Sequence, residues 1–261
     1  MVSATYRKKL FRLKHLWFAD IYDALQMISN TTDADLIYIH GIADTDIPNA
    51  VRLGTQHTLI KQLDDDPDAV FQTFGKHLRK FIQRSIGEGT IIRHFEGEEI
   101  DEKVLNACMN LYNKMKEDKG VSGTFNTDLA REYVKSGNLL VSLAFVGETV
   151  VGFKASIIDK TNLRAWVSAF SFRDGIIDAH VISRAHQLLE WEIMRTCCHK
   201  GISTLDFGGI YSFDEPNGID TFKMSLAKEG LHVTYHNYLV GTSLLGKLIV
   251  LGYKILKKLR K

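Results

Sequence analysis

The sequence has little proline, little cysteine and no long apolar run. Three prolines and no Ser- or Pro-rich stretch in 261 residues leave little room for a long linker. Three cysteines without a Cys-x-x-Cys pair exclude a disulfide-stapled scaffold and argue against structural zinc, so we expect a reducing compartment. No apolar run reaches the roughly 18 residues of a membrane span, and the chain start lacks a signal-peptide core. We therefore expect a cytoplasmic protein.

Acidic residues are missing from both ends of the chain. Residues 1–19 carry five basic side chains and residues 241–261 carry six, without one Asp or Glu in either segment. The segment 20–240 holds 22 basic and 31 acidic residues, so a formal net charge of +2 conceals an acidic body with basic ends. This pattern argues against a body that coats DNA, and it favours ends that meet an anionic surface.

Apolar periodicity and turn residues predict alternating helices and strands. In the first part of the chain we expect helices over 18–29 and from Pro67 to near Gly87 or Gly89, and strands over 35–40, 55–63 and 90–95. The acidic turn before Pro67 is the expected start of the second helix. From residue 100 we expect helices over 102–116, 126–134, 181–198 and 220–227, and strands over 139–145, 150–158, 163–172, 203–207 and 231–239. This order predicts an α/β protein of the α+β kind.

The segment 205–230, LDFGGIYSFDEPNGIDTFKMSLAKEG, carries the sharpest local signal. A buried strand ends in Asp206 and Phe207, followed by two glycines that permit a sharp turn and the close approach of a ligand. A polar loop follows, and then Phe222-Lys223 opens a short helix that can hold a cation near the strand end. The alternative is a glycine turn, a solvated loop and a surface lysine paired with Asp206.

This segment resembles the C-terminal signature of the FemAB-like branch of the GNAT acyltransferase superfamily. That branch has a DFGG strand end, a Gly-containing loop, then Phe-Lys and a short helix. Residues 76–93, KHLRKFIQRSIGEGTIIR, look like the branch's R-x-x-I-R-K-A-x-K-x-G helix and the strand after it. The element order from residue 100 is also similar to that of the GNAT fold. The resemblance covers roughly residues 55–240 and implies an abbreviated first lobe (1–95), a complete GNAT lobe (96–241) and a C-terminal helix (242–261).

The resemblance also implies roles for individual residues. Lys223 matches the lysine of the branch's Phe-Lys pair, which is thought to stabilise negative charge on the acyl-transfer intermediate. Asp206 would sit beside it, to orient Lys223 or to accept a proton from the attacking group. As catalytic residues we expect Lys223, Asp206 and His180, and as substrate-binding residues Phe222, Gly208, Gly209, Tyr211, Trp166 and Arg184.

The acyl donor does not follow from the resemblance, and acyl-CoA and aminoacyl-tRNA both remain open. GNAT enzymes that use CoA carry a Gly-rich pyrophosphate loop before the long helix. Residues 172–187 offer Arg173 and Gly175 there but no G-x-G or G-x-A. Acetyl-CoA is therefore the less favoured donor, although a helix N-terminus binds phosphate through its backbone N–H groups.

Several candidates have a structural alternative. His180 precedes the long helix and is either a base or a surface group near a helix cap. His186 and Glu190 have metal-ligand spacing, but no third ligand recurs nearby, so we expect no metal. Trp166 alternates with small residues on a strand and is either part of the core or a substrate-facing wall.

The C-terminal stretch TSLLGKLIVLGYKILKKLRK has an apolar stripe beside a basic one. The basic amphipathic N-terminus adds to this pattern. Such a helix either lies on an anionic leaflet or docks on the fold with a solvated lysine face.

Together these patterns predict an acyl- or aminoacyl-transferase that acts on an amine or hydroxyl of a cell-envelope polysaccharide or peptidoglycan-type precursor. Its partners would be an activated acyl donor and a sugar- or lipid-linked acceptor. Two alternatives remain: an acetyl-CoA-dependent N-acetyltransferase of an amino sugar, and a degenerate GNAT-like binding module at the membrane surface. We place the protein in the cytoplasm, with a peripheral position on the inner face of the cell membrane as an open expectation.

Overall fold

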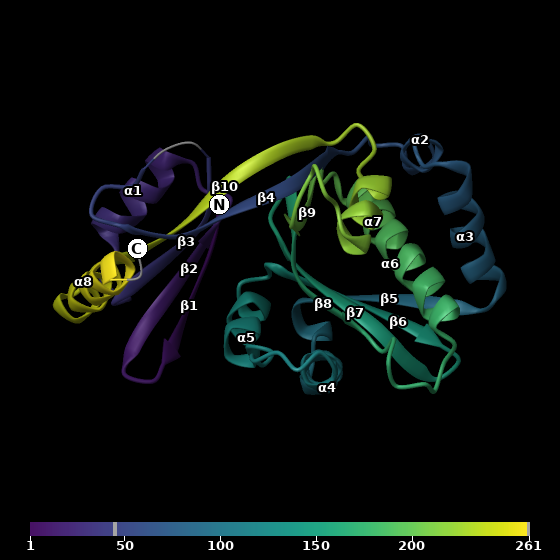
Figure 1. The fold of residues 1–261 in the computed structure, drawn as a ribbon, viewed down its shortest axis with the longest axis horizontal. Helices are drawn as coiled ribbons and strands as arrows, with labels where there is room; N and C mark the ends of the chain where they lie inside the picture. Colours follow the sequence, from purple (N-terminus) through teal and green to yellow (C-terminus); the bar gives the residue numbers. More distant parts are fainter. Residues whose placement is uncertain (44–45, 260–261) are drawn as a thin grey trace. The chain divides into compact units, whose positions relative to one another are not determined.

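A computed structural model describes residues 1–43 and 46–259, which form two compact units. Unit 1 consists of Met1–Thr58 with His232–Lys261, and unit 2 of Leu59–Leu231. The predicted lobes divide the chain elsewhere, at residues 95 and 241, so that residues 59–95 lie in unit 2 and the C-terminal segment lies in unit 1. The first unit boundary falls within strand β4 and the second at the start of strand β10 (Figure 1).

Unit 1 is a sheet with one helix against each face. Its strands follow the order β1-β2-β3-β10-β4. Ile37 and Ile39 of β3 pack toward helix α1, whereas Leu36 packs toward helix α8, because successive strand residues point to opposite faces. The bounds are β1 Val2–Lys8, β2 Phe11–Trp17, α1 Ile21–Asn30, β3 Leu36–Ile42, β4 Val51–Gln62, β10 Leu231–Gly241 and α8 Leu244–Leu259.

The basic N-terminus forms a β-hairpin. Strands β1 and β2 pair antiparallel from Val2 opposite Trp17 to Lys8 opposite Phe11, with Lys9 at positive φ in the turn. Alternating burial fits this pairing, since Val2 and Ala4 face inward while Ser3 and Thr5 are half-buried. An amphipathic terminal segment therefore becomes two strands of unit 1.

Unit 2 is a six-stranded sheet covered by helices on both faces. Its strands follow the order β4-β9-β8-β7-β6-β5. Neighbours from β5 to β8 are antiparallel, and β8 and β9 are parallel, joined by helix α6. Helices α2, α3 and α6 lie on one face and α4 and α5 on the other (Figure 1). The bounds are α2 Pro67–Gln72, α3 Lys76–Gly87, β5 Thr90–Glu96, η1 Gly97–Glu99, α4 Glu102–Asp118, α5 Thr127–Lys135, β6 Leu139–Val146, β7 Thr149–Ile158, β8 Asn162–Phe170, α6 Ala179–Lys200, β9 Thr204–Ile210 and α7 Gly218–Leu226.

The predicted α/β class and the element order from residue 100 are confirmed. The helix expected from Pro67 to near Gly87 or Gly89 is instead two helices, α2 and α3, separated at residues 73–75. Asp66 caps α2 with Pro67 in its first turn, as expected, and Gly75 is the N-cap of α3. In the part of the chain that the structure describes, none of the helices is long and apolar enough to cross a membrane.

Candidate functional site

Strands β8 and β9 run side by side for a short distance only. Their parallel pairing covers Asn162–Arg164 against Thr204–Asp206, whereas β9, which pairs with β4 on its other side, continues to Ile210. Two local features accompany this divergence. The register of β8 against β7 shifts by one residue at Trp166, which marks a β-bulge. Gly208 has φ +72°, a conformation that favours glycine.

Asp206 is the last residue of β9 in the register with β8, and both of its carboxylate oxygens accept hydrogen bonds. One carboxylate oxygen, Oδ2, accepts a hydrogen bond from Arg164, and both side chains are more than nine-tenths buried. The other oxygen, Oδ1, accepts from the backbone N–H of Gly208 at 2.8 Å. The Arg164 guanidinium compensates the charge of this carboxylate, and the two contacts together shape the strand end.

Lys223 reaches this strand end from helix α7. Its Nζ donates to the carbonyl oxygen of Gly209 at 2.6 Å. Burial lowers the pKa of Lys223 to about 8, and repulsion by Lys154 acts in the same direction, against the attraction of Glu190, Asp206 and Asp220. At pH 7 most of the population therefore carries an ammonium. An ammonium has three N–H donors, of which Gly209 takes one.

A buried ion pair lies beside Lys223. Lys154 Nζ on β7 contacts both oxygens of Glu190 on α6, at 2.9 and 2.7 Å, and each side chain is about 5% exposed. His186 Nε2 lies 3.5 Å from Glu190 Oε1. Burial alone would raise the pKa of Glu190, but Lys154 and His186 outweigh it and lower that pKa to about 2. Glu190 is thus held as a carboxylate.

Aromatic rings connect the ion pair to helix α7. The ring of His186 packs between Phe170, at a centroid distance of 4.1 Å, and Phe222, at 4.5 Å. Phe222 directly precedes Lys223, so this packing helps to fix the helix turn from which Lys223 projects. These groups form the Lys223 cluster, which consists of Lys154, Glu190, His186, Asp206, Phe222 and Lys223.

Asp220 holds the loop before α7 in place. Its buried carboxylate accepts hydrogen bonds from the backbone N–H groups of Tyr211, Ser212 and Asn217. Asn217 in turn caps α7 and accepts from the backbone of Ile219 and Asp220. The loop is therefore an ordered connection that sets the start of α7.

The structure brings together five of the nine predicted site residues, namely Lys223, Asp206, Phe222, Gly208 and Gly209. The others lie elsewhere. His180 and Tyr211 are exposed. Trp166 packs on Phe125 and Tyr133, on the face of the sheet that α4 and α5 cover. Arg184 forms a bidentate ion pair with Glu88, with both distances 2.7 Å.

Sequence reasoning missed Lys154 and assigned no role to His186 and Glu190 beyond metal spacing. The available signal for Lys154 was a lone charge inside the apolar strand VVGFKASII.

Among the described residues no group of three His, Cys, Asp or Glu side chains is arranged to hold a metal ion. Burial raises the pKa of Cys108 and that of Cys197 to about 12, so neither is a thiolate nucleophile at neutral pH.

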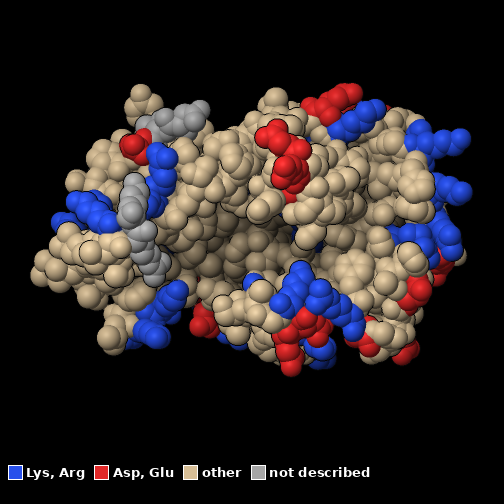
Figure 2. All heavy atoms as spheres, viewed as in Figure 1, with Lys and Arg blue, Asp and Glu red and all other residues tan. Residues whose placement is uncertain are grey.

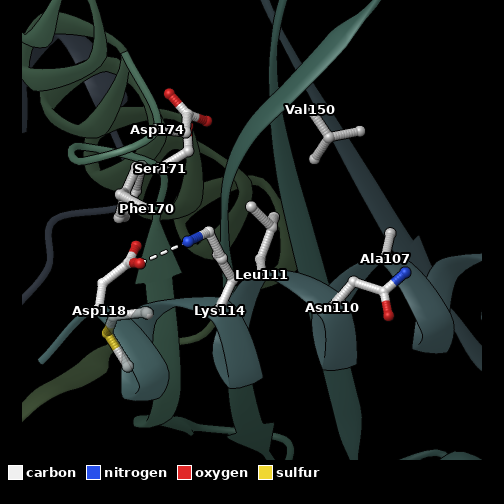
Figure 3. Close-up of a pocket in the computed structure, with 10 residues that line it drawn as sticks. Ala107, Asn110, Leu111, Lys114, Asp118, Val150, Phe170, Ser171 and Asp174 are labelled. Atoms are coloured by element: carbon white, nitrogen blue, oxygen red, sulfur yellow. Dashed lines mark hydrogen bonds and ion pairs between the residues drawn. The ribbon is translucent and has the colours of Figure 1, made fainter. Parts of the chain in front are cut away.

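A cavity of about 330 Å³ adjoins the Lys223 cluster through Phe170. Figure 3 shows side chains of α4 on one side of it and the end of β8 with the following loop on the other. An ion pair between Lys114 Nζ and Asp118 Oδ1, 2.5 Å long, lies on its α4 side (Figure 3). The lining residues are Ala107, Asn110, Leu111, Lys114, Met115, Asp118, Val150, Phe170, Ser171 and Asp174.

Gly208→Ala should destabilise the protein more than Gly201→Ala does. Both glycines have φ near +71°, so both variants incur a left-handed penalty of about 1 kcal/mol. Only at Gly208 would the new Cβ also lie 3.2 Å from the carbonyl oxygen of Ala165, whereas at Gly201 nothing lies within 4 Å. Thermal unfolding of both variants measures the difference, and equal losses would contradict a close approach of β8 and β9 at Gly208.

Comparison with known families agrees with this geometry. The family model described as acetyltransferase (GNAT) domain matches residues 72–224. The chain belongs to the GNAT family. The matched part of the chain contains all six residues of the Lys223 cluster. The expectation of an acyltransferase is confirmed. No protein with a curated description matches the chain.

Solved structures share the fold. The C-terminal domain of a protein described as a lysylphosphatidylglycerol synthetase from Agrobacterium fabrum has 12% identity and a TM-score of 0.58, covering 97% of this chain and 84% of its own. FemX has 11% identity and a TM-score of 0.58, with coverages of 91% and 83%. L-PGS from Bacillus licheniformis has 11% identity and a TM-score of 0.53, with coverages of 95% and 83%. At these identities the likeness concerns the fold, and at that level the resemblance to the FemAB-like branch is confirmed.

Proposed function

We propose that the protein transfers an acyl or aminoacyl group to an amine or hydroxyl of a cell-envelope polysaccharide or peptidoglycan-type precursor. The observation that carries the proposal is Lys223, a half-buried ammonium held at the point where β8 and β9 diverge. The FemAB-like resemblance of residues 205–230 and the fold shared with FemX and a lysylphosphatidylglycerol synthetase support an acceptor of the cell envelope.

In the proposed reaction the acceptor attacks the activated carbonyl directly. Negative charge develops on the carbonyl oxygen in the transition state, and Lys223 donates a hydrogen bond to it. The attacking group gives up a proton, the leaving group takes one up, and no covalent enzyme intermediate forms. Asp206 is a positioning residue here, because its carboxylate fixes Gly208 next to the carbonyl that binds Lys223.

The N-terminus of helix α6 disfavours acetyl-CoA as the donor, so we propose an aminoacyl-tRNA or another non-CoA donor. The N-terminus of α6, where a CoA pyrophosphate would need backbone N–H groups, is capped by Asp178. The Asp178 carboxylate accepts from the N–H groups of His180 and Val181, at 2.8 and 3.2 Å. These hydrogen bonds lower the pKa of Asp178, so it is an anion that occupies the donors and repels phosphate.

Acetyl-CoA and longer acyl-CoAs should therefore bind no more tightly than tens of micromolar, an order-of-magnitude value for a site without free backbone phosphate contacts. Isothermal titration calorimetry measures this affinity. Asp178→Gly, which removes the anion and uncovers both N–H groups, should tighten any residual binding. Low-micromolar binding by the unaltered protein would make the acetyl-CoA-dependent N-acetyltransferase of an amino sugar the better proposal.

A transfer assay tests the proposed function itself. The protein is incubated with aminoacyl-tRNA carrying radiolabelled amino acids, or with radiolabelled acetyl-CoA, and with lipid-linked and nucleotide-linked sugar precursors. We expect label to move from tRNA to a precursor and the transfer to depend on Lys223. Absence of transfer from both donors to both acceptor classes would contradict the proposal. Native mass spectrometry for co-purifying CoA, tRNA or sugar nucleotide guides the choice of donor.

We also propose that the protein works in the cytoplasm, on the inner face of the cell membrane. A membrane-linked acceptor would require such a position. Helix α8 of unit 1 offers the surface that supports it.

A further inference from the structure

Helix α8 has an apolar face toward the core of unit 1 and a second apolar face toward solvent. Surface helices of globular proteins usually have one apolar stripe, which faces the core, and a polar opposite side. In α8 the inward contacts come from Gly246 and Val250, of which Val250 is 4% exposed. The five residues of the outward stripe are Leu244, Leu248, Leu251, Ile255 and Leu259, which recur at helical spacing.

The inward face docks α8 firmly. Gly246 comes so close to the chain that a Cβ there would overlap the carbonyl oxygen of Asp35. Ser243 Oγ donates to Asp35 Oδ1 at 2.7 Å and accepts from the N–H of Gly246. Val250 packs with Leu13 and other buried side chains of unit 1. Removal of residues 242–261 would therefore uncover part of this core.

The outward stripe remains exposed although the helix is docked. Its five members are between 51% and 78% exposed, and Leu245 and Leu256 next to it are 43% and 55% exposed. The helix therefore docks on unit 1 through Gly246 and Val250, and its apolar stripe takes no part in the docking. A contiguous exposed apolar strip of this kind indicates a binding surface.

The lysines beside the outward stripe indicate what kind of partner the α8 surface binds. Lys247, Lys254 and Lys258 follow one edge of the stripe, and residues 241–261 contain no acidic residue. At the place of α8, Figure 2 shows mostly uncharged atoms bordered by blue and no red. Two copies of the chain joined through their stripes would bring these lysine rows near each other without a compensating acid. An anionic bilayer supplies both an apolar layer for the leucines and negative charge for the lysines.

We propose that the outward stripe of α8 inserts into the surface of an anionic bilayer. The helix would lie parallel to the membrane, with its leucines at the level of the acyl-chain boundary and its lysine edge among the headgroups. The docked inward face transmits this attachment to unit 1, so α8 anchors the folded protein and is not a free tail. This proposal does not depend on the acyl-transfer chemistry.

The test is co-sedimentation of the full chain with vesicles of phosphatidylcholine alone or of phosphatidylcholine with phosphatidylglycerol. We expect binding to the second kind, weakened by salt because screening shortens the reach of the lysines. The triple variant Leu248→Ser, Leu251→Ser, Ile255→Ser should bind at least about tenfold more weakly, because each change removes a buried apolar group from the lipid. Its melting temperature should stay nearly unchanged, since all three side chains are more than half exposed.

A matched triple variant in unit 2 is the control. Ile86→Ser, Ile91→Ser and Ile176→Ser alter three exposed isoleucines outside α8 in the sequence and should leave vesicle binding unchanged. Equal binding to both vesicle types, absence of binding, or normal binding by the α8 variant would each overturn the proposal. Sedimentation equilibrium without lipid adds a further outcome: a dimer that the α8 variant converts to monomer would make a second copy the occupant and also overturn it.

Discussion

Lys223→Ala is expected to lower kcat by about 10²–10³-fold, which corresponds to about 3–4 kcal/mol of transition-state stabilisation. The loss follows from the role proposed for Lys223, a preorganised ammonium near the oxygen that becomes negative. The melting temperature of the variant should change little, because the half-buried Lys223 side chain contributes a hydrogen bond to a backbone carbonyl, that of Gly209, and no buried ion pair is broken within the described residues. A transfer assay and thermal unfolding measure the two quantities. Lys228→Ala, which removes an exposed lysine just after α7, is the control and should leave both unchanged.

The pH profile gives a second measure of the same role. Since the pKa of Lys223 is about 8, the protonated form required for oxyanion stabilisation is lost as pH rises through that value. We therefore expect kcat to fall above about pH 8. Lys223→Arg keeps its charge at these pH values and should recover part of the activity without that decline. Normal activity of Lys223→Ala, or a kcat that rises through pH 8, would contradict the assignment.

Lys154→Met is expected to lower the free energy of unfolding by about 3–5 kcal/mol at neutral pH. Its partner Glu190 is 4% exposed, so the substitution would leave a carboxylate buried without its counter-charge. The double variant Lys154→Met, Glu190→Leu should recover most of the loss, because an apolar pair carries no desolvation penalty. Urea denaturation measures all three proteins. Lys114→Met is the control. Lys114 is half exposed and pairs with Asp118, so this substitution should lower the free energy of unfolding by less than about 1 kcal/mol.

The pH dependence of stability separates this effect from simple loss of packing. The folded-state pKa of Glu190, about 2, lies below its ordinary value of 4.5. Its ion pair therefore stabilises the native protein fully above pH 4.5, and that contribution is lost as pH falls toward 2. In Lys154→Met the buried Glu190 prefers to be protonated, so the loss relative to the unaltered protein should shrink as pH is lowered from 7. A loss independent of pH would indicate a packing defect instead.

The sequence alone determined the elements from residue 100 onward and the chemistry of the strand end. Apolar periodicity and turn residues are local properties, so they located the helices and strands of the GNAT domain to within a few residues. Lys223, Asp206, Phe222, Gly208 and Gly209 lie within 18 consecutive positions, and that closeness made their gathering predictable. The helix expected from Pro67 to near Gly87 or Gly89 is divided at Gly75, where a local capping residue interrupts the pattern.

Tertiary structure decided everything that depends on residues far apart in the chain. Lys154 and Glu190 are separated by 36 positions, and only the packing of α6 on the sheet makes them a buried ion pair. Arg184 pairs with Glu88 across 96 positions, a contact that periodicity does not encode. The basic N-terminus becomes a hairpin because a neighbouring strand, β3, pairs with β2. For α8 the sequence determined that an apolar and a basic stripe exist, but the packing of Gly246 and Val250 on unit 1 decided which face is exposed.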